Sequence, residues 1–227
     1  MNKLITWVLI LSMTVWLCNA LVFDGLSEQA EVLSLREPKP PAKIATIYSL
    51  DSHKNPMYSH IIYAINHKLN TYSSAPYMDD DEVDQIAQSV MWGWHEFGIP
   101  PSLTLSIMEQ ESGFNYKAVS DVGAMGLMQV MPRYSKKARQ ELGIRGDVCK
   151  ILYTPHLNVR IGITMLNNFF IAVSDRGYCS KNVALTAYNA GESNAFKFYR
   201  ERDTKAKSKY ARLVLKHINW YRSAGIL

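Results

Sequence analysis

The spacing of apolar residues from residue 79 onward constrains the fold of this chain more than any other feature. Val83, Ile86, Val90 and Trp94 recur at intervals of three or four residues, which places them on one face of a helix. Similar stripes follow downstream, and no stretch of useful length after residue 79 alternates apolar and polar residues as a half-buried strand would. We therefore predict a compact all-α domain over residues 79–227.

Capping signals divide this region into separate helices. Acidic residues from Asp79 to Glu82 favour the positive N-terminal end of a first helix, which Gly98 ends. Pro100-Pro101 suits the first turn of a second helix, because its early amides have no intrahelical partner, and Gly113 ends it. Further helices are predicted from Pro132 to about Gly143, from Thr154-Pro155 along Leu157, Ile161, Met165 and Phe169, from Ser180 to Gly191, and around Tyr210, Leu213, Leu215, Ile218 and Tyr221.

The first 20 residues have the pattern of a secretory signal peptide. Lys3 supplies a positive charge, residues 4–17 are apolar and uncharged, and small residues precede a cleavage point after Ala20. An alternative is an uncleaved membrane anchor, because residues 1–23 hold an apolar run just long enough to cross a bilayer. Both interpretations predict an exported protein, which is periplasmic or secreted, or is anchored to the inner membrane.

Residues 21–78 are predicted to form an N-terminal extension and linker. The proline-rich stretch from Glu37 to Lys43 favours an extended conformation, because proline removes backbone donors. Residues 57–69 could form one short amphipathic helix, and residues 72–76 are expected to be a loop. The chain is thereby divided into residues 1–20, 21–78 and 79–227.

The formal net charge of +5 says little about partners. Lys and Arg are scattered, apart from a loose cluster from Arg200 to Lys209, and no nucleic-acid-binding motif accompanies them. We therefore expect no nucleic-acid partner. The excess of positive charge fits either a solvated basic surface or attraction to a polyanion such as a bacterial envelope.

Cysteine and histidine residues give few signals. Cys149 and Cys179 would remain after removal of residues 1–20, and they could form a disulfide in an oxidising compartment or stay as two thiols. The six histidines show no tight ligand spacing, so no metal site is predicted.

Glu111 has a position that suits a general acid. Leu103 and Ile107 precede it by eight and four residues, which puts its carboxyl on the apolar side of the second helix. It also lies in the last turn, where the helix end is partially negative. Both effects disfavour the carboxylate and should raise its pKa, as a general acid near neutral pH requires. By position alone, however, a capping or ion-paired glutamate is the simpler interpretation.

Glu109 lies on the same helix but points in another direction. Two residues correspond to a rotation of about 200° around the helix axis. We interpret Glu109 as a solvent-facing or structural charge.

Four sequence blocks favour the catalytic interpretation of Glu111. They are ESGFN at residues 111–115, AVS at 118–120, GAMGLMQVMP at 123–132 and AYNAG at 187–191. In this order and spacing they resemble the soluble lytic transglycosylase family, whose catalytic domain is similar to goose lysozyme. The third block followed by the fourth is the specific part of the match. The resemblance covers roughly residues 79–222 and implies a lysozyme-like helical domain that acts on peptidoglycan glycan strands.

The resemblance also implies roles for individual residues. Glu111 matches the family's single catalytic glutamate, and Ser120 resembles a serine that hydrogen-bonds N-acetylmuramic acid next to the cleaved bond. Gln129 and Met131 match residues that line the glycan groove. Tyr188 and Asn189 match a Tyr-Asn pair that faces the catalytic acid.

Other residues of these blocks have simpler explanations. Gly123 and Gly126 would let the backbone turn tightly beside the sugar. Met125 and Met128 are expected to fill the core. Asp121 stands where proline is frequent in the family, and it adds a second acid near the groove.

The activity implied by the resemblance is a lytic transglycosylase that needs no cofactor. Glu111 would protonate the oxygen between N-acetylmuramic acid and N-acetylglucosamine, the substrate's own N-acetyl group would stabilise the positive charge, and a 1,6-anhydro ring would form. One alternative is a lysozyme-type hydrolase with Asp121 as second carboxylate. Others are a wall-binding protein that has lost activity, and a wall-remodelling subunit of an envelope-spanning assembly in which residues 21–78 dock a protein partner.

Overall fold

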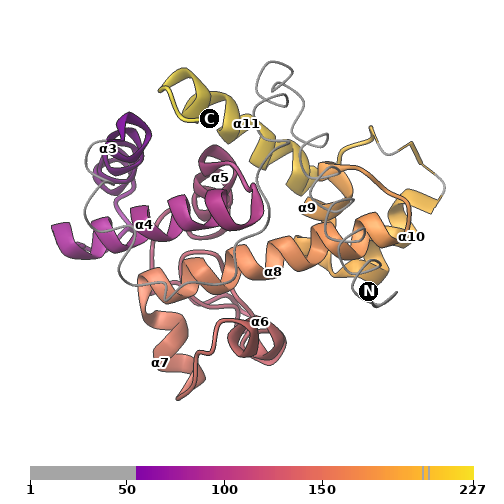
Figure 1. The fold of residues 1–227 in the computed structure, drawn as a ribbon, viewed down its shortest axis with the longest axis horizontal. Coiled ribbons are helices and arrows are strands. Elements are labelled where there is room, and N and C mark those ends of the chain that lie inside the picture. The colour runs from indigo at the N-terminus through magenta and orange to yellow at the C-terminus, as the bar shows by residue number, and fades with distance from the viewer. Residues whose placement is uncertain (1–54, 201, 204) are drawn as a thin grey trace, which may run out of the picture.

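The computed structural model describes residues 55–227 apart from residues 201 and 204, and this part of the chain is all-α as predicted (Figure 1). Residues 1–20, with the predicted signal peptide or anchor, and the proline-rich linker lie outside the described residues. Within the described residues, extended pairing is limited to two isolated antiparallel bridges in the loop 118–131. The helices are α3 (Pro56–Thr71), α4 (Asp80–Phe97), α5 (Pro101–Ser112), the 3-10 helix η2 (Pro132–Tyr134), α6 (Lys136–Glu141), α7 (Val148–Tyr153), α8 (Pro155–Asp175), α9 (Lys181–Ala190), α10 (Glu192–Arg200) and α11 (Lys209–Ser223).

Helix α8 runs through the middle of the domain (Figure 1) and contacts α4, α6, α7, α9 and α10. Because neighbours cover several of its sides, burial is not confined to the predicted stripe. Ile161 is completely buried, whereas Leu157, Met165 and Phe169 are only partly covered. Among the described helices, α8 is also the one long and apolar enough to cross a membrane. However, 56% of its apolar stretch is buried inside the domain. It is therefore the core helix of the domain.

The boundaries of α4 and α5 follow the predicted capping signals. Asp79 accepts the amide of Glu82 at 2.8 Å, and the Glu82 carboxylate accepts the amide of Asp79 at 3.2 Å, which forms a capping box. Gly98 and Gly113 end the two helices in the left-handed conformation, with φ of 68° and 56°. The turn that carries Glu111 is therefore encoded locally.

Helix α3 belongs to the same core as the helices after residue 79. The Asn55 side chain caps it by accepting the amide of Met57 at 2.9 Å. Ile61 and Ile65 are completely buried, and the hydroxyl of Tyr58 donates to the Asp84 carboxylate on α4 at 2.5 Å. The domain boundary predicted at residue 79 would separate two helices that share one core, so we propose that the domain begins before α3.

Three local predictions need correction. The helix predicted from Pro132 to Gly143 is split into η2 and α6, with buried Ser135 between them and its hydroxyl bonded to the Pro132 carbonyl at 2.8 Å. Helix α7, capped by Asp147, and helix α10, which follows the left-handed Gly191, were not predicted. Helix α7 has only six residues, fewer than two turns, and α10 begins directly after Gly191, where the sequence signals the end of a helix.

The sequence left open whether Cys149 and Cys179 form a disulfide or stay as two thiols. The structure does not bond these two cysteines, and both side chains are exposed. Cys149 lies on α7 and Cys179 follows α8, so the 21 residues of α8 separate them.

Candidate active site

Glu111 lies in the last turn of α5, partly buried, and is held by one hydrogen bond from a distant helix. The hydroxyl of Tyr210, on α11, donates to Glu111 Oε1 at 2.6 Å. Burial raises the pKa of Glu111 to about 7, against the smaller lowering effect of the Tyr210 hydrogen bond. The raised pKa predicted from the apolar side of the helix is therefore what the structure shows.

Tyr188 and Tyr210 bring two further helices to this carboxyl. Tyr188 lies on α9, where it packs edge-on against Phe169 and its hydroxyl donates to the Met128 carbonyl at 2.9 Å. Burial raises the pKa of both tyrosines well above the usual value, and the negative charge of Glu111 raises them further. Sequence reasoning expected Tyr188 near the acid but treated Tyr210 only as part of an apolar stripe.

The loop 118–131 is tied to α8 and to the end of α5. Asn158, completely buried on α8, accepts the Met128 amide at 2.9 Å and donates to the carbonyls of Met125 and Leu152 at 2.9 and 2.8 Å. The hydroxyl of Ser112, next to Glu111, donates to the Leu127 carbonyl at 2.9 Å. These bonds place the loop beside the catalytic candidate.

The predicted substrate-binding residues of this loop take part in its own structure. Ser120 Oγ accepts the amide of Ala124 at 3.0 Å, so it caps a tight turn. Gln129 has a positive φ of 47°, and its Nε2 donates to the carbonyls of Ala118 and Gly126 at 3.2 and 3.0 Å. Met131 is partly buried where η2 begins. Hydrogen bonds within the loop therefore hold the side chains of Ser120 and Gln129.

The other residues singled out in and beside the four blocks differ in exposure and backbone conformation. Asn189 is exposed near the end of α9, and Asp121 is exposed in the turn that Ser120 caps. Met125 and Met128 are buried in the core, as predicted. Gly123 and Gly126 have positive φ values of 84° and 76°, which confirms the expected tight turns.

Glu109 is a buried structural charge and not a solvent-facing one. Its side chain is 3% exposed and forms an ion pair with Lys68 Nζ at 2.7 Å. Burial raises its pKa, but hydrogen bonds from His217, Lys68, Tyr72 and Tyr221 outweigh that effect and lower the pKa to about 2. Glu109 and Glu111 therefore face different environments on opposite sides of α5.

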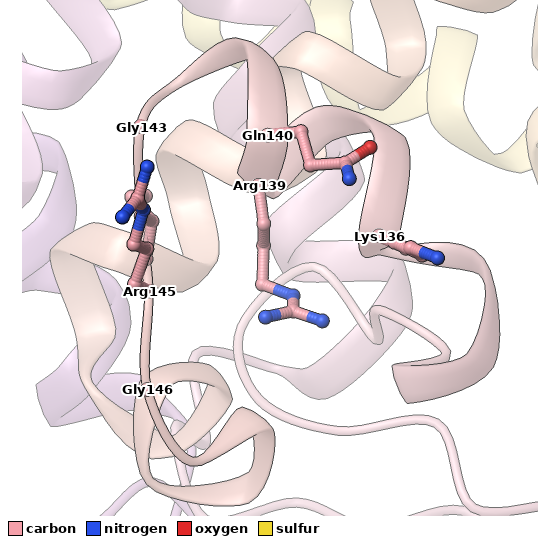
Figure 2. A pocket seen from close by; sticks show the side chains of 7 residues that line it. Lys136, Arg139, Gln140, Gly143, Arg145 and Gly146 are labelled. Carbon is pink, nitrogen blue, oxygen red and sulfur yellow. The ribbon is translucent and has the colours of Figure 1, made fainter.

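An open hollow lies elsewhere, at α6. It has a volume of about 560 Å³, and its lining includes none of the predicted site residues. Figure 2 shows Arg139 and Arg145 at this hollow, with Lys136 nearby on α6. Its lining holds no acid, so it cannot supply the proton that glycan cleavage requires. Within the described residues, no three His, Cys, Asp or Glu side chains lie together as a metal site.

Comparison with known proteins places the chain among transglycosylase domains. Residues 92–211 match the family described as the Transglycosylase SLT domain. The membrane-bound lytic murein transglycosylase C of Klebsiella pneumoniae (strain 342) is 31% identical over 144 residues, which cover 61% of this chain and 39% of that protein. The chain thus spans about two fifths of the length of this curated relative.

A solved structure shares the fold. An inactive mutant of the lytic transglycosylase Slt from Pseudomonas aeruginosa matches with a TM-score of 0.53 at 23% identity, covering 76% of this chain and 29% of that one. The 70 kDa soluble lytic transglycosylase of Escherichia coli matches with a TM-score of 0.45 at 19% identity, over 83% of this chain and 38% of that one. Since the family match spans more than half of the chain and includes Glu111, the loop 118–131 and Tyr188, the chain belongs to the transglycosylase SLT domain family.

Proposed function

We propose that the protein is a lytic transglycosylase that cleaves the β-1,4 bond between N-acetylmuramic acid and N-acetylglucosamine in peptidoglycan and leaves 1,6-anhydro ends. The observation that carries this proposal is the partly buried Glu111 with a pKa of about 7. A carboxyl with that pKa is protonated in about half of the molecules at neutral pH, so it can donate a proton and later accept one. Family membership and the name of the Klebsiella relative point the same way.

The hydrogen bond from Tyr210 favours one oxygen of Glu111 as the acid. Because Tyr210 donates to Oε1, the proton of the neutral carboxyl belongs on Oε2, which would face the glycosidic oxygen. Proton transfer from Oε2 lets the bond from C1 of the muramoyl residue to the bridging oxygen break. The Tyr210 hydroxyl then stabilises the carboxylate that forms.

In the second step, Glu111 acts as a base. It removes the proton from the C6 hydroxyl of the muramoyl residue while that oxygen bonds to C1, and this closes the 1,6-anhydro ring. The substrate's own N-acetyl group stabilises the positive charge at C1 between the two steps. No water is consumed, and the carboxyl ends the cycle protonated.

The loop 118–131 and α9 supply the proposed substrate contacts. Ser120 Oγ accepts an amide of its own turn, so its hydroxyl proton is available to the muramoyl residue. Gln129 uses Nε2 within the loop, which leaves its Oε1 to accept from a sugar hydroxyl. Met131, Tyr188 and Asn189 complete the proposed groove.

The surroundings of Glu111 favour this reaction over lysozyme-type hydrolysis. Hydrolysis usually requires a second carboxylate that activates water or forms a covalent intermediate. Within the part of the chain that the structure describes, burial and Tyr210 shift the pKa of Glu111, and no carboxylate there contributes to the shift. The nearest candidate in sequence, Asp121, is exposed.

The cell envelope is the proposed location. The substrate lies there, the Klebsiella relative is described as membrane-bound, and residues 1–23 have the pattern of an export signal or anchor. A protein partner for residues 21–78 stays a prediction.

Digestion of purified peptidoglycan by the wild type and by Glu111→Gln tests the function. Mass spectrometry should find products with anhydro ends from the wild type and almost none from the variant. Products heavier by one water would assign the protein to the lysozyme-type hydrolases. Equal release by both proteins would exclude Glu111 as the acid.

A further inference from the structure

Glu109 gathers side chains from two separate parts of the chain around one buried carboxylate. Its Oε1 accepts from Lys68 Nζ on α3 at 2.7 Å and from the hydroxyl of Tyr72 at 2.6 Å, and it lies 3.2 Å from His217 Nδ1 on α11. Its Oε2 accepts from the hydroxyl of Tyr221, also on α11, at 2.8 Å. Both carboxylate oxygens are therefore satisfied although the side chain is nearly inaccessible to water.

The partners of Glu109 lie outside the residues that match the family. Lys68 and Tyr72 precede residue 92, and His217 and Tyr221 follow residue 211. Lys68 also makes a cation–π contact on α11, with Nζ 3.9 Å from the centre of the Trp220 ring. The first described helix, α3, is thus joined electrostatically to both α5 and α11.

Helix α11 links this cluster to the catalytic candidate. Tyr210 and Tyr221 are 11 residues apart, which corresponds to three helical turns within about 20°, so they lie on the same face of α11. Tyr221 holds Glu109 and Tyr210 holds Glu111, and these two acids lie two residues apart on α5. Because both helices are rigid, movement at the Glu109 end would displace the Tyr210 hydroxyl from Glu111.

We propose that Lys68 and Tyr72 are positioning residues for catalysis: by anchoring Glu109 they hold α11 against α5 so that Tyr210 stays bonded to Glu111. This inference rests on the proposed function of Glu111. The two residues do not touch the reacting atoms. The titratable groups that interact with Glu111 itself include Tyr210 on α11 and Tyr188 on α9. Of these two, Tyr210 is the residue whose position depends on Glu109 and its partners.

Kinetics of full-length variants on soluble glycan strands test the proposal. Lys68→Met and Tyr72→Phe should lower kcat by about 10- to 100-fold with little change in KM, because misplacement of a catalytic group by a fraction of an ångström weakens the transition state more than substrate binding. Tyr72→Phe removes only a hydroxyl, so it carries the test if Lys68→Met does not fold. Tyr58→Phe is the matched control, because the hydroxyl of Tyr58 anchors α3 to Asp84 on α4, and it should keep wild-type kcat.

The pH profile separates positioning from plain stability. Loss of the Tyr210 hydrogen bond removes a contact that lowers the pKa of Glu111, so the alkaline limb of kcat should move to higher pH in Lys68→Met and Tyr72→Phe, as it should in Tyr210→Phe. If the cluster acts through Tyr210, combining Tyr210→Phe with Tyr72→Phe should give less than the product of the two separate losses in kcat.

Three outcomes would overturn the proposal. They are wild-type kcat in both variants, an unshifted alkaline limb, and fully multiplicative losses in the double variant. An equal loss of kcat in Tyr58→Phe would also contradict it, because general loosening of α3 would then suffice. An inactive wild type would refute the proposed function instead, so the two failures are distinguishable.

Discussion

Glu109 and Glu111 show how two identical side chains on one helix acquire opposite properties. Burial raises the pKa of each carboxyl, but Glu109 receives several donors and its pKa falls to about 2, while Glu111 receives one and its pKa rises to about 7. At neutral pH Glu109 is therefore an anion, whereas Glu111 holds its proton about half of the time. The number of donors within reach decides which glutamate can act as an acid.

Glu111→Gln should abolish activity and stabilise the fold at alkaline pH. Loss of a general acid lowers the rate by about 10²- to 10⁴-fold or more. Because the folded pKa of Glu111 lies above its unfolded value of 4.5, the folded state binds the proton more tightly, and stability declines as pH rises from about 4.5 to about 7. Removing this titration should add up to about 3 kcal/mol to the free energy of unfolding at pH 8 and little at pH 4.

Thermal or urea unfolding of the wild type and Glu111→Gln at pH 4 and pH 8 measures this difference. Asp121→Asn serves as the control, because Asp121 is exposed and should change neither stability nor kcat. A stability difference independent of pH would show that the pKa of Glu111 is not raised.

Tyr210→Phe should shift the pH dependence of kcat as well as lower kcat. The hydroxyl of Tyr210 stabilises the Glu111 carboxylate, and a hydrogen bond to a charged group contributes about 1.5–3 kcal/mol. We expect kcat to fall by roughly 10- to 100-fold and the alkaline limb to move to higher pH. A lower kcat with an unchanged pH profile would argue against this role.

At the scale of elements, the loop 118–131 acquires its shape from α8 and α5. The side chain of Asn158 on α8 hydrogen-bonds three backbone groups, two of which belong to the loop. The hydroxyl of Ser112 on α5 donates to the loop at the Leu127 carbonyl. Gly126 permits this close approach, because a Cβ atom there would lie 2.5 Å from the carbonyl oxygen of Leu152. The proposed sugar contacts at Ser120 and Gln129 therefore depend on a helix that lacks any catalytic group.

Asn158→Ala should destabilise the domain and impair catalysis together. The change leaves buried backbone groups of the loop without partners, and each costs about 1–3 kcal/mol. We expect the free energy of unfolding to fall by about 2–5 kcal/mol and KM for glycan strands to rise. Asn168→Ala is a matched control on the same helix, because the side chain of Asn168 bonds to exposed Glu141 at 3.0 Å and the change should alter stability by less than about 0.5 kcal/mol.

At the scale of the whole molecule, α3 completes a core that the family match only partly covers. Tyr58, Ile61 and Ile65 are buried against the other helices, and Lys68 neutralises the charge of Glu109. Loss of α3 would expose an apolar surface and leave a buried carboxylate without its cation. We therefore propose that α3 is part of the same folding unit as the helices after residue 79.

A chain starting at residue 55 should be far more stable than one starting at residue 79. Removal of one partner from a buried ion pair alone costs about 3–5 kcal/mol, and lost burial of α3 adds to that. Comparison of their unfolding midpoints in urea, together with their activity on peptidoglycan, measures the contribution of α3. Equal unfolding midpoints in urea for the two chains would support the domain boundary predicted at residue 79.

Local signals in the sequence were enough to predict most of the helices and the order of the site blocks. Some features depend only on residues that are close in sequence, so the sequence alone reveals them. They are the capping by Asp79, the helix ends at Gly98 and Gly113, and the apolar side that carries Glu111. Helix α7 was missed because it spans fewer than two turns, and α10 was missed because it begins directly after Gly191, which signals the end of a helix.

The sequence by itself therefore determined an all-α chain with an acid on an apolar helix face and the blocks of a transglycosylase domain. Only the tertiary structure decided that Tyr210 binds Glu111 across 99 residues of sequence, and that Lys68 and Tyr221 make Glu109 a buried anion. The physical reason is that a carboxyl's pKa depends on burial and on donors within about 3 Å, and those distances are set by the packing of helices far apart in the chain.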